Sequence, residues 1–281
     1  MAGSLVPSVK ASFDLTGQVA MITGGSGLLG IQHAAALAEL GAHIALLDIS
    51  DERGEEAVRR IVSSFGVKSL FVRTDITNPA SISDALAAVL QAFGRVDILI
   101  NNAANNPKPV SSSEGHHSRF ETFSLDTWND DLGVGLTGSF LCSQIVGREM
   151  ARARRGVILN VASDLALIAP DQRIYRVDGV PEEAQPVKAV TYSVVKAGLV
   201  GLTRYLASYW ADAGVRANAI CPGGVFNDHE EAFVHRLVNL IPMGRMARVD
   251  EYKAAVAFLC SGASSYMTGS VLVVDGGRTC W

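Results

Sequence analysis

Short apolar runs alternate along the chain with longer stretches in which apolar residues recur at helical spacing. Residues 18–23 form the first run, bounded by glycine on both sides, as expected of a buried parallel strand. Residues 28–40 carry Ala and Leu three and four positions apart, up to Gly41, a residue suited to end a helix. Repetition of this pattern predicts strands at residues 18–23, 42–47, 68–73, 96–101, 157–161, 215–220 and 271–274, and helices at residues 28–40, 55–64, 81–93, 126–153, 192–213 and 250–259.

The order of these elements predicts the fold class. Strands joined through helices form parallel sheets with right-handed crossovers, which place helices against both faces. We therefore expect an α/β Rossmann fold, a doubly wound seven-stranded parallel sheet with helices on both faces. No linker-like segment or internal repeat divides the chain. Residues 13–281 are thus predicted to form a single domain, preceded by a flexible arm at residues 1–12.

Three long stretches interrupt the alternation, at residues 105–125, 164–188 and 224–248. Each follows the carboxyl end of a predicted strand, the edge at which open α/β sheets bind ligands. Loops of this length in a compact domain usually bind or cover a ligand. We expect the polar insert 164–188 and the loop 224–248 to lie over an active site.

Composition excludes several classes of protein. Hydrophobic residues make up 48% of the 281 and charged residues 19%, which argues against a disordered chain. The net charge of −4, without a basic run, argues against nucleic acid as a partner. No apolar run reaches the roughly 20 residues of a membrane span, and no signal peptide is evident. The four scattered cysteines are expected to be buried thiols of a cytoplasmic protein, with neither disulfides nor a metal site.

A glycine-rich turn joins the first predicted strand to the first predicted helix. Its sequence is Thr23-Gly24-Gly25-Ser26-Gly27-Leu28-Leu29-Gly30. We expect positive φ angles at Gly24 and Gly27, which let the backbone approach a pyrophosphate, and close packing of helix on strand at Gly30. Turns collect glycine for other reasons. The position between a strand and an amphipathic helix favours dinucleotide binding.

Asp48 stands at the end of the second predicted strand, 18 residues after Gly30. A carboxylate at this place accepts hydrogen bonds from the ribose hydroxyls of NAD and repels the 2′-phosphate of NADP. A helix-capping aspartate is the alternative interpretation. Arg53 is close in sequence, but no basic residue flanks the turn or Asp48 directly. The pattern therefore predicts NAD as the cofactor.

Tyr192 and Lys196 are four positions apart in a predicted helix and hence share one face. A phenol with a pKa near 10 is a poor base at neutral pH, and a cation within about 6 Å favours its phenolate form. Ser163, just after the strand at 157–161, can hydrogen-bond a substrate oxygen. Taken singly, a packed tyrosine, a surface lysine and a capping serine are the simpler interpretations.

In combination, these motifs resemble the short-chain dehydrogenase/reductase family from about residue 13 to residue 277. The motifs are the glycine turn, Asn101-Asn102-Ala103-Ala104, Asn160-Val161-Ala162-Ser163, Tyr192 with Lys196, Asn218-Ala219-Ile220-Cys221-Pro222-Gly223, and Thr268-Gly269 with Val274-Asp275-Gly276-Gly277. The resemblance implies that Tyr192 is the catalytic acid/base and that Ser163 positions the reacting oxygen. It also implies that Lys196 lowers the pKa of the tyrosine and binds the nicotinamide ribose.

The same resemblance implies a set of cofactor contacts. Asp75 and Ile76 would hold the adenine, and Asn102 and Val225 would line the cofactor. The full predicted cofactor site consists of Gly24, Ser26, Gly27, Leu28, Leu29, Asp48, Ile49, Asp75, Ile76, Asn102, Ala103, Tyr192, Lys196, Pro222, Gly223, Val225 and Asn227. The family further implies a homodimer or homotetramer. The long helices at 126–153 and 192–213, and Trp281 at the C-terminus, are candidates for the interface.

The chain departs from the family pattern at several points. The spacing of the glycine turn is typical of the family's longer branch, whereas the length and the Asn-Asn-Ala segment match its shorter branch. In that shorter branch a helix asparagine completes a proton relay, and Gly135 stands at the equivalent position. The insert separates Ser163 from Tyr192 by 29 residues, more than twice the usual interval. Asn227 replaces the usual threonine.

Polar side chains are frequent in two of the irregular stretches. The insert carries Asp164, Asp171, Gln172, Arg173, Tyr175, Arg176 and Lys188, and the earlier loop carries Asn105, Asn106, Lys108, His116, His117 and Arg119. Guanidinium groups pair with phosphates and carboxylates, so these stretches favour a hydroxyl-rich or anionic substrate. A solvated lid exterior or an oligomer contact is the alternative. The insert is similar to oxidoreductases linked to bacterial nonulosonate and surface-glycan synthesis.

These observations predict an NAD(H)-dependent oxidoreductase that interconverts a secondary alcohol and a ketone on a polar, sugar-like or anionic small molecule. An epimerase or dehydratase that oxidises its substrate transiently is one alternative. A catalytically silent dinucleotide-binding protein is another.

Overall fold

Seven parallel strands form one sheet at the centre of the computed structural model, which describes residues 8–105 and 118–281. The strands are β1 (Val19–Thr23), β2 (His43–Asp48), β3 (Ser69–Arg73), β4 (Ile98–Asn101), β5 (Gly156–Val161), β6 (Val215–Pro222) and β7 (Val271–Val274). Their order in the sheet is β3-β2-β1-β4-β5-β6-β7, and every neighbouring pair is parallel. This is the doubly wound order, and the predicted fold class is confirmed.

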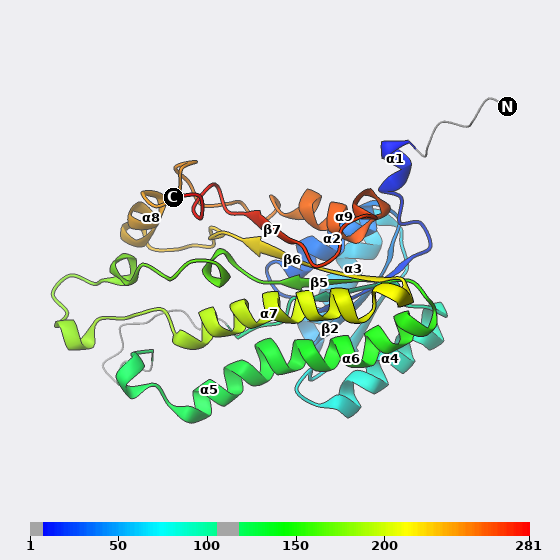
Figure 1. Cartoon of the computed structure of the whole chain (residues 1–281), viewed down its shortest axis with the longest axis horizontal. Coiled ribbons are helices and arrows are strands. Elements are labelled where there is room, and N and C mark those ends of the chain that lie inside the picture. Colours follow the sequence, from blue (N-terminus) through cyan, green and yellow to red (C-terminus); the bar gives the residue numbers. More distant parts are fainter. Residues whose placement is uncertain (1–7, 106–117) are drawn as a thin grey trace.

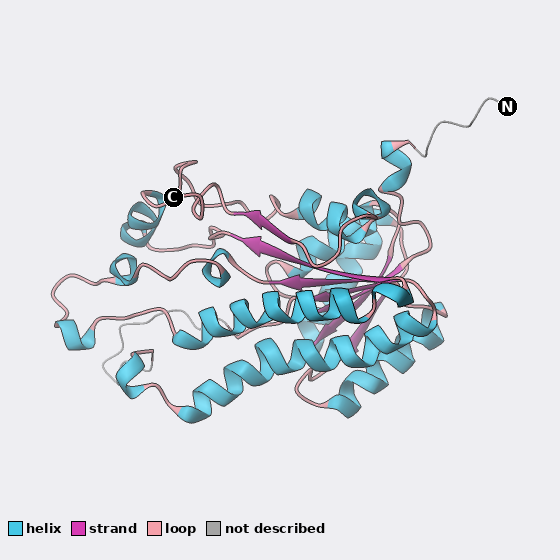
Figure 2. Ribbon diagram, in the orientation of Figure 1, coloured by secondary structure: helices cyan, strands magenta, loops and turns pink. Residues whose placement is uncertain are grey.

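Helices cover both faces of this sheet (Figure 2). The α-helices are α1 (Val9–Ser12), α2 (Gly30–Glu39), α3 (Asp51–Phe65), α4 (Pro79–Phe93), α5 (Leu125–Leu132), α6 (Gly138–Arg152), α7 (Val190–Tyr209), α8 (Glu231–Val238) and α9 (Lys253–Cys260). Helices α2, α3 and α9 pack on one face, and α4, α6 and α7 on the other. The alternation within β1 explains the two layers, because Ala20 and Ile22 enter the first core while Val19 and Met21 enter the second.

Short helical turns fill the irregular segments. They are η1 (Phe120–Thr122), η3 (Asp164–Ala166), η4 (Gln172–Tyr175), η5 (Glu182–Ala184), η6 (Ala211–Ala213) and η7 (Gly262–Ser264). Three of them lie in the polar insert, and α8 lies in the stretch 224–248. In Figure 1 the arrowheads of β5, β6 and β7 point toward the insert, α8 and the C-terminus, whereas the N-terminus lies at the opposite end. The carboxyl edge of the sheet is therefore the covered edge.

The prediction of a single helix over residues 126–153 is wrong in the middle of that range. Helices α5 and α6 are separated by a π-helix, η2 (Gly133–Thr137). Glycine has low helix propensity, and two glycines fall within this segment. π-helical turns inside α-helices are frequent at functional sites.

Three further observations concern the ends and surface of the chain. Residues 1–7 of the predicted arm lie outside the described residues, while α1 forms a short turn that contacts η7. Cys142, Cys221 and Cys260 are buried as predicted, but Cys280 is exposed because it lies beyond the last strand. Within the described ranges, no helix is long and apolar enough to cross a membrane.

Candidate active site

The glycine turn lies between β1 and α2, at the carboxyl edge of the sheet. Gly24 has φ of +58°, and a Cβ on Gly30 would lie 2.2 Å from the Gly24 carbonyl oxygen. Both positions therefore require glycine. The predicted positive φ at Gly27 is wrong, because Gly27 already takes part in helical bonding, with its carbonyl accepting from the Ile31 N–H at 3.1 Å. No side chain caps the start of α2, and an uncapped helix N-terminus is suited to bind an anion.

Asp48 connects the end of β2 to this turn. One carboxylate oxygen accepts from the Ser26 N–H at 3.2 Å and from the Ser26 hydroxyl at 2.5 Å, and the other accepts from the Ile49 N–H at 2.8 Å. Arg53 approaches the same carboxylate at 3.7 Å, with a largely exposed side chain. Asp48 itself is buried and the Ile49 side chain is exposed beside it.

Asn102 holds the turn from the other side, at the end of β4. Its side-chain N–H groups donate to the carbonyl oxygens of Thr23 and Gly24, at 3.0 and 3.1 Å. The backbone N–H groups of Asn102 and Ala103 both donate to the Thr23 hydroxyl. These contacts fix the turn, its uncapped helix start and the Asp48 carboxylate in one rigid group, and this group fits a dinucleotide.

A cavity of about 440 Å³ extends from this turn across the carboxyl ends of β4, β5 and β6. Ten of the predicted residues line it, namely Leu28, Leu29, Asn102, Ser163, Tyr192, Lys196, Pro222, Gly223, Val225 and Asn227. The other predicted cofactor residues lie away from it, toward β1, β2, β3 and β4, namely Gly24, Ser26, Gly27, Asp48, Ile49, Asp75, Ile76 and Ala103. Of the two predicted adenine contacts, Asp75 is exposed and Ile76 is buried.

The structure brings Ser163, Tyr192 and Lys196 together in this cavity. Helix α7 carries the tyrosine and the lysine, and the lysine ammonium lies 5.8 Å from the centre of the Tyr192 ring. That ammonium donates to the Val161 carbonyl oxygen at 2.7 Å, which anchors it to the end of β5. Burial raises the pKa of Tyr192, and its hydrogen bond with Ser163 lowers it. Burial lowers the pKa of Lys196 to about 8, and the nearby Lys188 ammonium contributes to this lowering.

Lys188 is a second cation beside the tyrosine, four positions before it in the chain and just before α7. Its ammonium lies 3.9 Å from the centre of the Tyr192 ring. Burial lowers the pKa of Lys188 to about 8, whereas the carboxylates of Asp164 and Asp131 act in the opposite direction. Two ammonium groups therefore lie near the Tyr192 ring, and their positive charge opposes the rise in its pKa that burial causes.

The polar insert contributes a buried ion pair to the cavity. Arg278, which follows β7, donates to Asp164 at 2.9 Å, and the two side chains are only 7% and 4% exposed. The other oxygen of Asp164 accepts from the Ser163 hydroxyl at 2.7 Å. The reactive end of the cavity is thus bordered by a hydrogen-bonded row running from Arg278 through Asp164 to Ser163.

The two arginines within the insert lie elsewhere. Arg173 pairs with Asp171 and Arg176 pairs with Glu182, and both arginines are exposed on the outer side of the insert. Neither lines the cavity. Arg119, from the earlier loop, donates to the Glu182 carbonyl oxygen at 2.9 Å and so joins that loop to the insert. Asn106, Lys108, His116 and His117 lie outside the described residues.

Sequence reasoning missed several residues that line the cavity. Arg278, His229 and Phe233 come from segments after β6 and β7. Only Arg278 could have been found from the sequence, because it directly follows the Asp275-Gly276-Gly277 motif. Nothing in the local pattern of the other two marks them as inward-facing.

Comparisons with known proteins identify the family. The family described as short chain dehydrogenase matches residues 18–175, and the one described as enoyl-(acyl carrier protein) reductase matches residues 180–279. This chain belongs to the short-chain dehydrogenase/reductase family. It is accordingly an oxidoreductase of an alcohol/ketone pair that binds a nicotinamide dinucleotide and acts on a small molecule.

Individual relatives agree over nearly the full length. A D-threitol dehydrogenase of Mycolicibacterium smegmatis is 36% identical in a 277-residue alignment that covers 97% of this chain and 96% of the relative. The crystal structure of a gluconate 5-dehydrogenase from Burkholderia cenocepacia in complex with NADP and tartrate has a TM-score of 0.84 at 28% identity, covering 98% of this chain and 100% of that one. An NAD⁺-bound xylitol dehydrogenase has a TM-score of 0.81 at 26% identity, covering 94% and 99%.

Proposed function

We propose that this protein is an NAD-dependent dehydrogenase that oxidises a secondary hydroxyl of a polyol or similar hydroxyl-rich molecule to a ketone. The observation that carries the proposal is the buried row of Ser163, Asp164 and Arg278 beside Tyr192 in one cavity. A site lined by fixed polar groups discriminates strongly against analogues that lack matching hydroxyls, because its buried groups would then stay unpaired. Similarity to proteins named for D-threitol and xylitol supports the same class of substrate.

In this proposal Tyr192 takes the proton of the reacting hydroxyl. The ammonium groups of Lys196 and Lys188 favour its phenolate, and Ser163 hydrogen-bonds the reacting oxygen. The bound nicotinamide supplies the hydride acceptor. The Ser163 hydroxyl donates to the Asp164 carboxylate at 2.7 Å in the structure, so it would turn from Asp164 to the reacting oxygen when the substrate binds.

Arg278 is the proposed contact for a second hydroxyl. A guanidinium has five N–H donors, and the Nη1 group that pairs with Asp164 leaves others for a ligand. The pair is electrically neutral as a unit, which suits a neutral polyol better than a phosphate or carboxylate. The earlier expectation of an anion held by Arg173 and Arg176 has no support from their positions on the outer side of the insert.

NAD is the proposed cofactor because Asp48, at the end of β2 beside the glycine turn, would repel a 2′-phosphate. Its carboxylate is buried and held by Ser26 and Ile49, so it cannot easily turn away. Repulsion between this carboxylate and a phosphate disfavours NADP.

The test of the chemistry is Tyr192→Phe, with Tyr209→Phe as the matched control on the exposed side of the same helix. We expect turnover with excess NAD⁺ and a polyol to fall at least about 100-fold in Tyr192→Phe, because the acid/base is lost. Affinity for NAD⁺ should stay within a few-fold of wild type, and Tyr209→Phe should behave as wild type. Persisting turnover would remove Tyr192 from the mechanism.

The same assay separates a dehydrogenase from the non-redox alternatives. A dehydrogenase forms one NADH for each ketone, measured by absorbance of the reduced nicotinamide. An epimerase or dehydratase that returns its hydride forms none, and a silent binder forms neither product.

We also propose that residues 13–281 act as one domain and that this domain forms a homodimer or homotetramer. On α7, Tyr205 and Tyr209 are exposed and stack with ring centres 5.6 Å apart, which gives an apolar patch suited to a subunit contact. Light scattering of wild type and of Tyr205→Glu/Tyr209→Glu tests this. A monomeric wild type would contradict it.

A further inference from the structure

Gly135 leaves the proton-relay position of the shorter branch without a side chain, and the structure explains why. A Cβ on Gly135 would lie 2.5 Å from a methyl carbon of Val195, so Val195 fills the space that a larger residue would need. The carbonyl oxygen of Gly135 accepts from the Ser139 hydroxyl at 2.9 Å. Another group must therefore connect the catalytic lysine to solvent.

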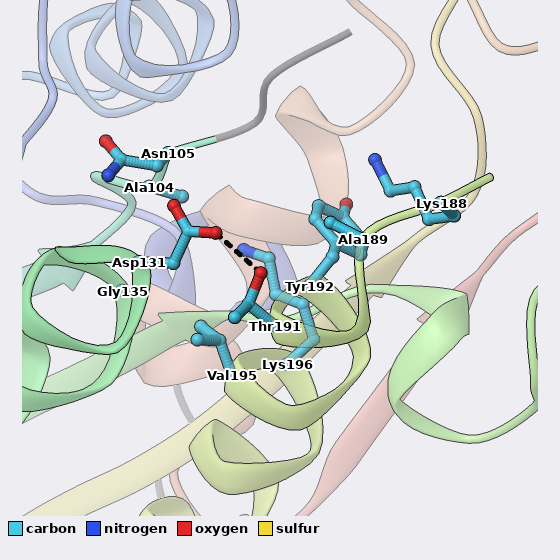
Figure 3. A pocket seen from close by; sticks show the side chains of 10 residues that line it. All are labelled: Ala104, Asn105, Asp131, Gly135, Lys188, Ala189, Thr191, Tyr192, Val195 and Lys196. Atoms are coloured by element: carbon cyan, nitrogen blue, oxygen red, sulfur yellow. Dashed lines mark hydrogen bonds between the residues drawn. The ribbon is translucent and has the colours of Figure 1, made fainter. Parts of the chain in front are cut away.

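Asp131 lies one helical turn before Gly135, at the C-terminal end of α5. Its side chain is buried, and one oxygen accepts from the Thr191 hydroxyl at 2.5 Å. Thr191 directly precedes Tyr192 in α7. This bond, shown dashed in Figure 3, therefore holds the carboxylate against the catalytic helix.

A small cavity brings Asp131 and the catalytic residues together. Its lining includes Asp131, Thr191, Tyr192, Lys196 and, at its outer side, the exposed Asn105 (Figure 3). The volume is about 10 Å³, enough for the centre of a single water molecule. Carboxylate, ammonium and phenol are the polar partners that such a water needs.

We propose that Asp131 is the positioning residue that replaces the missing relay asparagine, by holding one water beside Lys196 and exchanging protons with solvent past Asn105. The proposal rests on the proposed dehydrogenase function. Oxidation of the alcohol sends a hydride to the dinucleotide and releases one proton, which Tyr192 takes from the hydroxyl. The Lys196 ammonium gives one proton through the water to the Asp131 carboxylate, and the amine left behind accepts the proton from Tyr192. Asp131 then releases its proton to solvent, so the site returns to its starting charge.

The charges around the cavity suit this role. Tyr192 and Lys196 face the cavity from α7, Lys188 faces it from the segment before α7, and Asp131 is the carboxylate that faces it from α5. Without Asp131, the two ammonium groups would lose a counter-charge on this side. An asparagine at residue 131 keeps an acceptor for Thr191 and for the water but cannot take up a proton. Asp131→Asn therefore separates proton uptake by the carboxylate, which the proposal assigns to Asp131, from the mere holding of the water and of helix α7.

The test compares Asp131→Asn and Asp131→Ala with Asp130→Asn, the exposed neighbour in the same helix. We expect kcat for the wild type's best alcohol to fall about tenfold or more in both Asp131 variants, with a larger solvent deuterium isotope effect and a displaced pH profile. KM, NAD⁺ affinity and thermal midpoint should change little. Formate added to Asp131→Ala should restore kcat with saturation, because a small acid can then carry the proton.

A second measurement needs no substrate. After a jump to high pH, absorbance at the tyrosinate wavelength, taken as the difference from Tyr192→Phe, gives the rate at which Tyr192 loses its proton. We expect this rate to fall in Asp131→Ala, with and without NAD⁺, and formate to restore it. If Asp131→Ala folds poorly, Thr191→Val should give a smaller loss of the same kind, and Thr191→Ser should behave as wild type.

The outcomes distinguish this proposal from the proposed function. If the protein oxidises another alcohol but not polyols, the relay stands and only the substrate assignment fails. The same holds if no alcohol is oxidised but the rate of tyrosinate formation falls in Asp131→Ala and is restored by formate. Wild-type kcat and tyrosinate rate in Asp131→Asn would overturn the relay. So would a loss of activity that parallels lost NAD⁺ affinity or stability and does not respond to formate.

Discussion

Carboxylates of the polar insert form two kinds of ion pair with arginine, which differ in burial more than in geometry. Arg278 and Asp164 are 2.9 Å apart with side chains 7% and 4% exposed, whereas Arg173 and Asp171 are 2.6 Å apart with side chains 82% and 20% exposed. The shorter pair is the one in water. Distance therefore does not identify the pair that matters to the site.

The difference follows from solvation. Exposed ion pairs contribute roughly 0–1 kcal/mol, because water already stabilises each charge. A buried pair costs several kcal/mol in desolvation, and removal of one partner leaves an uncompensated charge. A chain retains such a pair where its fixed polar groups serve a purpose, and here both partners line the cavity beside Ser163.

The largest expected effect comes from breaking the buried pair. Arg278→Met leaves the Asp164 carboxylate buried and unpaired, and we expect the free energy of unfolding to fall by about 3–5 kcal/mol. Denaturant unfolding measures this, and the double variant Asp164→Leu/Arg278→Met should recover most of the loss while remaining inactive on polyols. The control is Arg173→Met in the exposed pair. Equal losses of unfolding free energy in Arg278→Met and Arg173→Met would contradict the distinction between the buried and the exposed pair.

A second buried group, His33 in α2, extends the comparison of buried and exposed groups to the pH dependence of stability. Burial lowers its pKa from 6.5 to about 4, so the folded protein keeps it neutral where the unfolded chain binds a proton. Stability should therefore fall by about 3 kcal/mol between pH 6.5 and pH 4, and this contribution should not change further below pH 4. Unfolding curves across this range test it. His33→Gln should flatten the dependence, whereas the exposed control His235→Gln should not.

Asp48 extends the comparison of buried and exposed carboxylates to the predicted cofactor site. Asp48→Ser removes a buried carboxylate, and we expect the ratio of kcat/KM for NAD⁺ over NADP⁺ to fall about 10- to 100-fold, the equivalent of one or two charged hydrogen bonds. The control is Asp51→Ser, where the carboxylate is exposed and paired with Arg73. An unchanged ratio would show that Asp48 does not select the cofactor.

The smallest effect is expected on the outer side of the insert. Charge reversal at Arg173 or Arg176 should change stability by no more than about 0.5 kcal/mol, because both arginines are exposed. KM for neutral and anionic substrates should change less than about twofold. A selective rise in KM for an anionic substrate would instead indicate that these arginines contact the substrate.

Much of the fold and of the cofactor region was predictable because their signals are local. Short apolar runs that alternate with helical stretches predicted all seven strands, and parallel strands bring their carboxyl ends to one edge. Motifs at those ends, such as the glycine turn and Asn102, therefore had to meet, and they do. Boundaries moved by a few residues, and the helix at 126–153 was wrong where Gly133 and Gly135 lie in the π-helix η2.

The substrate side could not be predicted in the same way, because long-range packing decides it. Asp164 and Arg173 look alike in the sequence, and only contact with Arg278, more than 100 positions away, places one of them inside. Asp131 had no motif at all. Its place in the site depends on a hydrogen bond with Thr191 of another helix.

The central claim is that the cavity recognises a hydroxyl-rich secondary alcohol. The most direct test is kcat/KM with NAD⁺ for D-threitol and xylitol against butan-2-ol, a secondary alcohol without further hydroxyls, with the ketone product identified. The account predicts at least about tenfold preference for a polyol, because the buried polar groups need partners. Equal efficiency with butan-2-ol, or NAD⁺ binding without oxidation of either polyol, would contradict it.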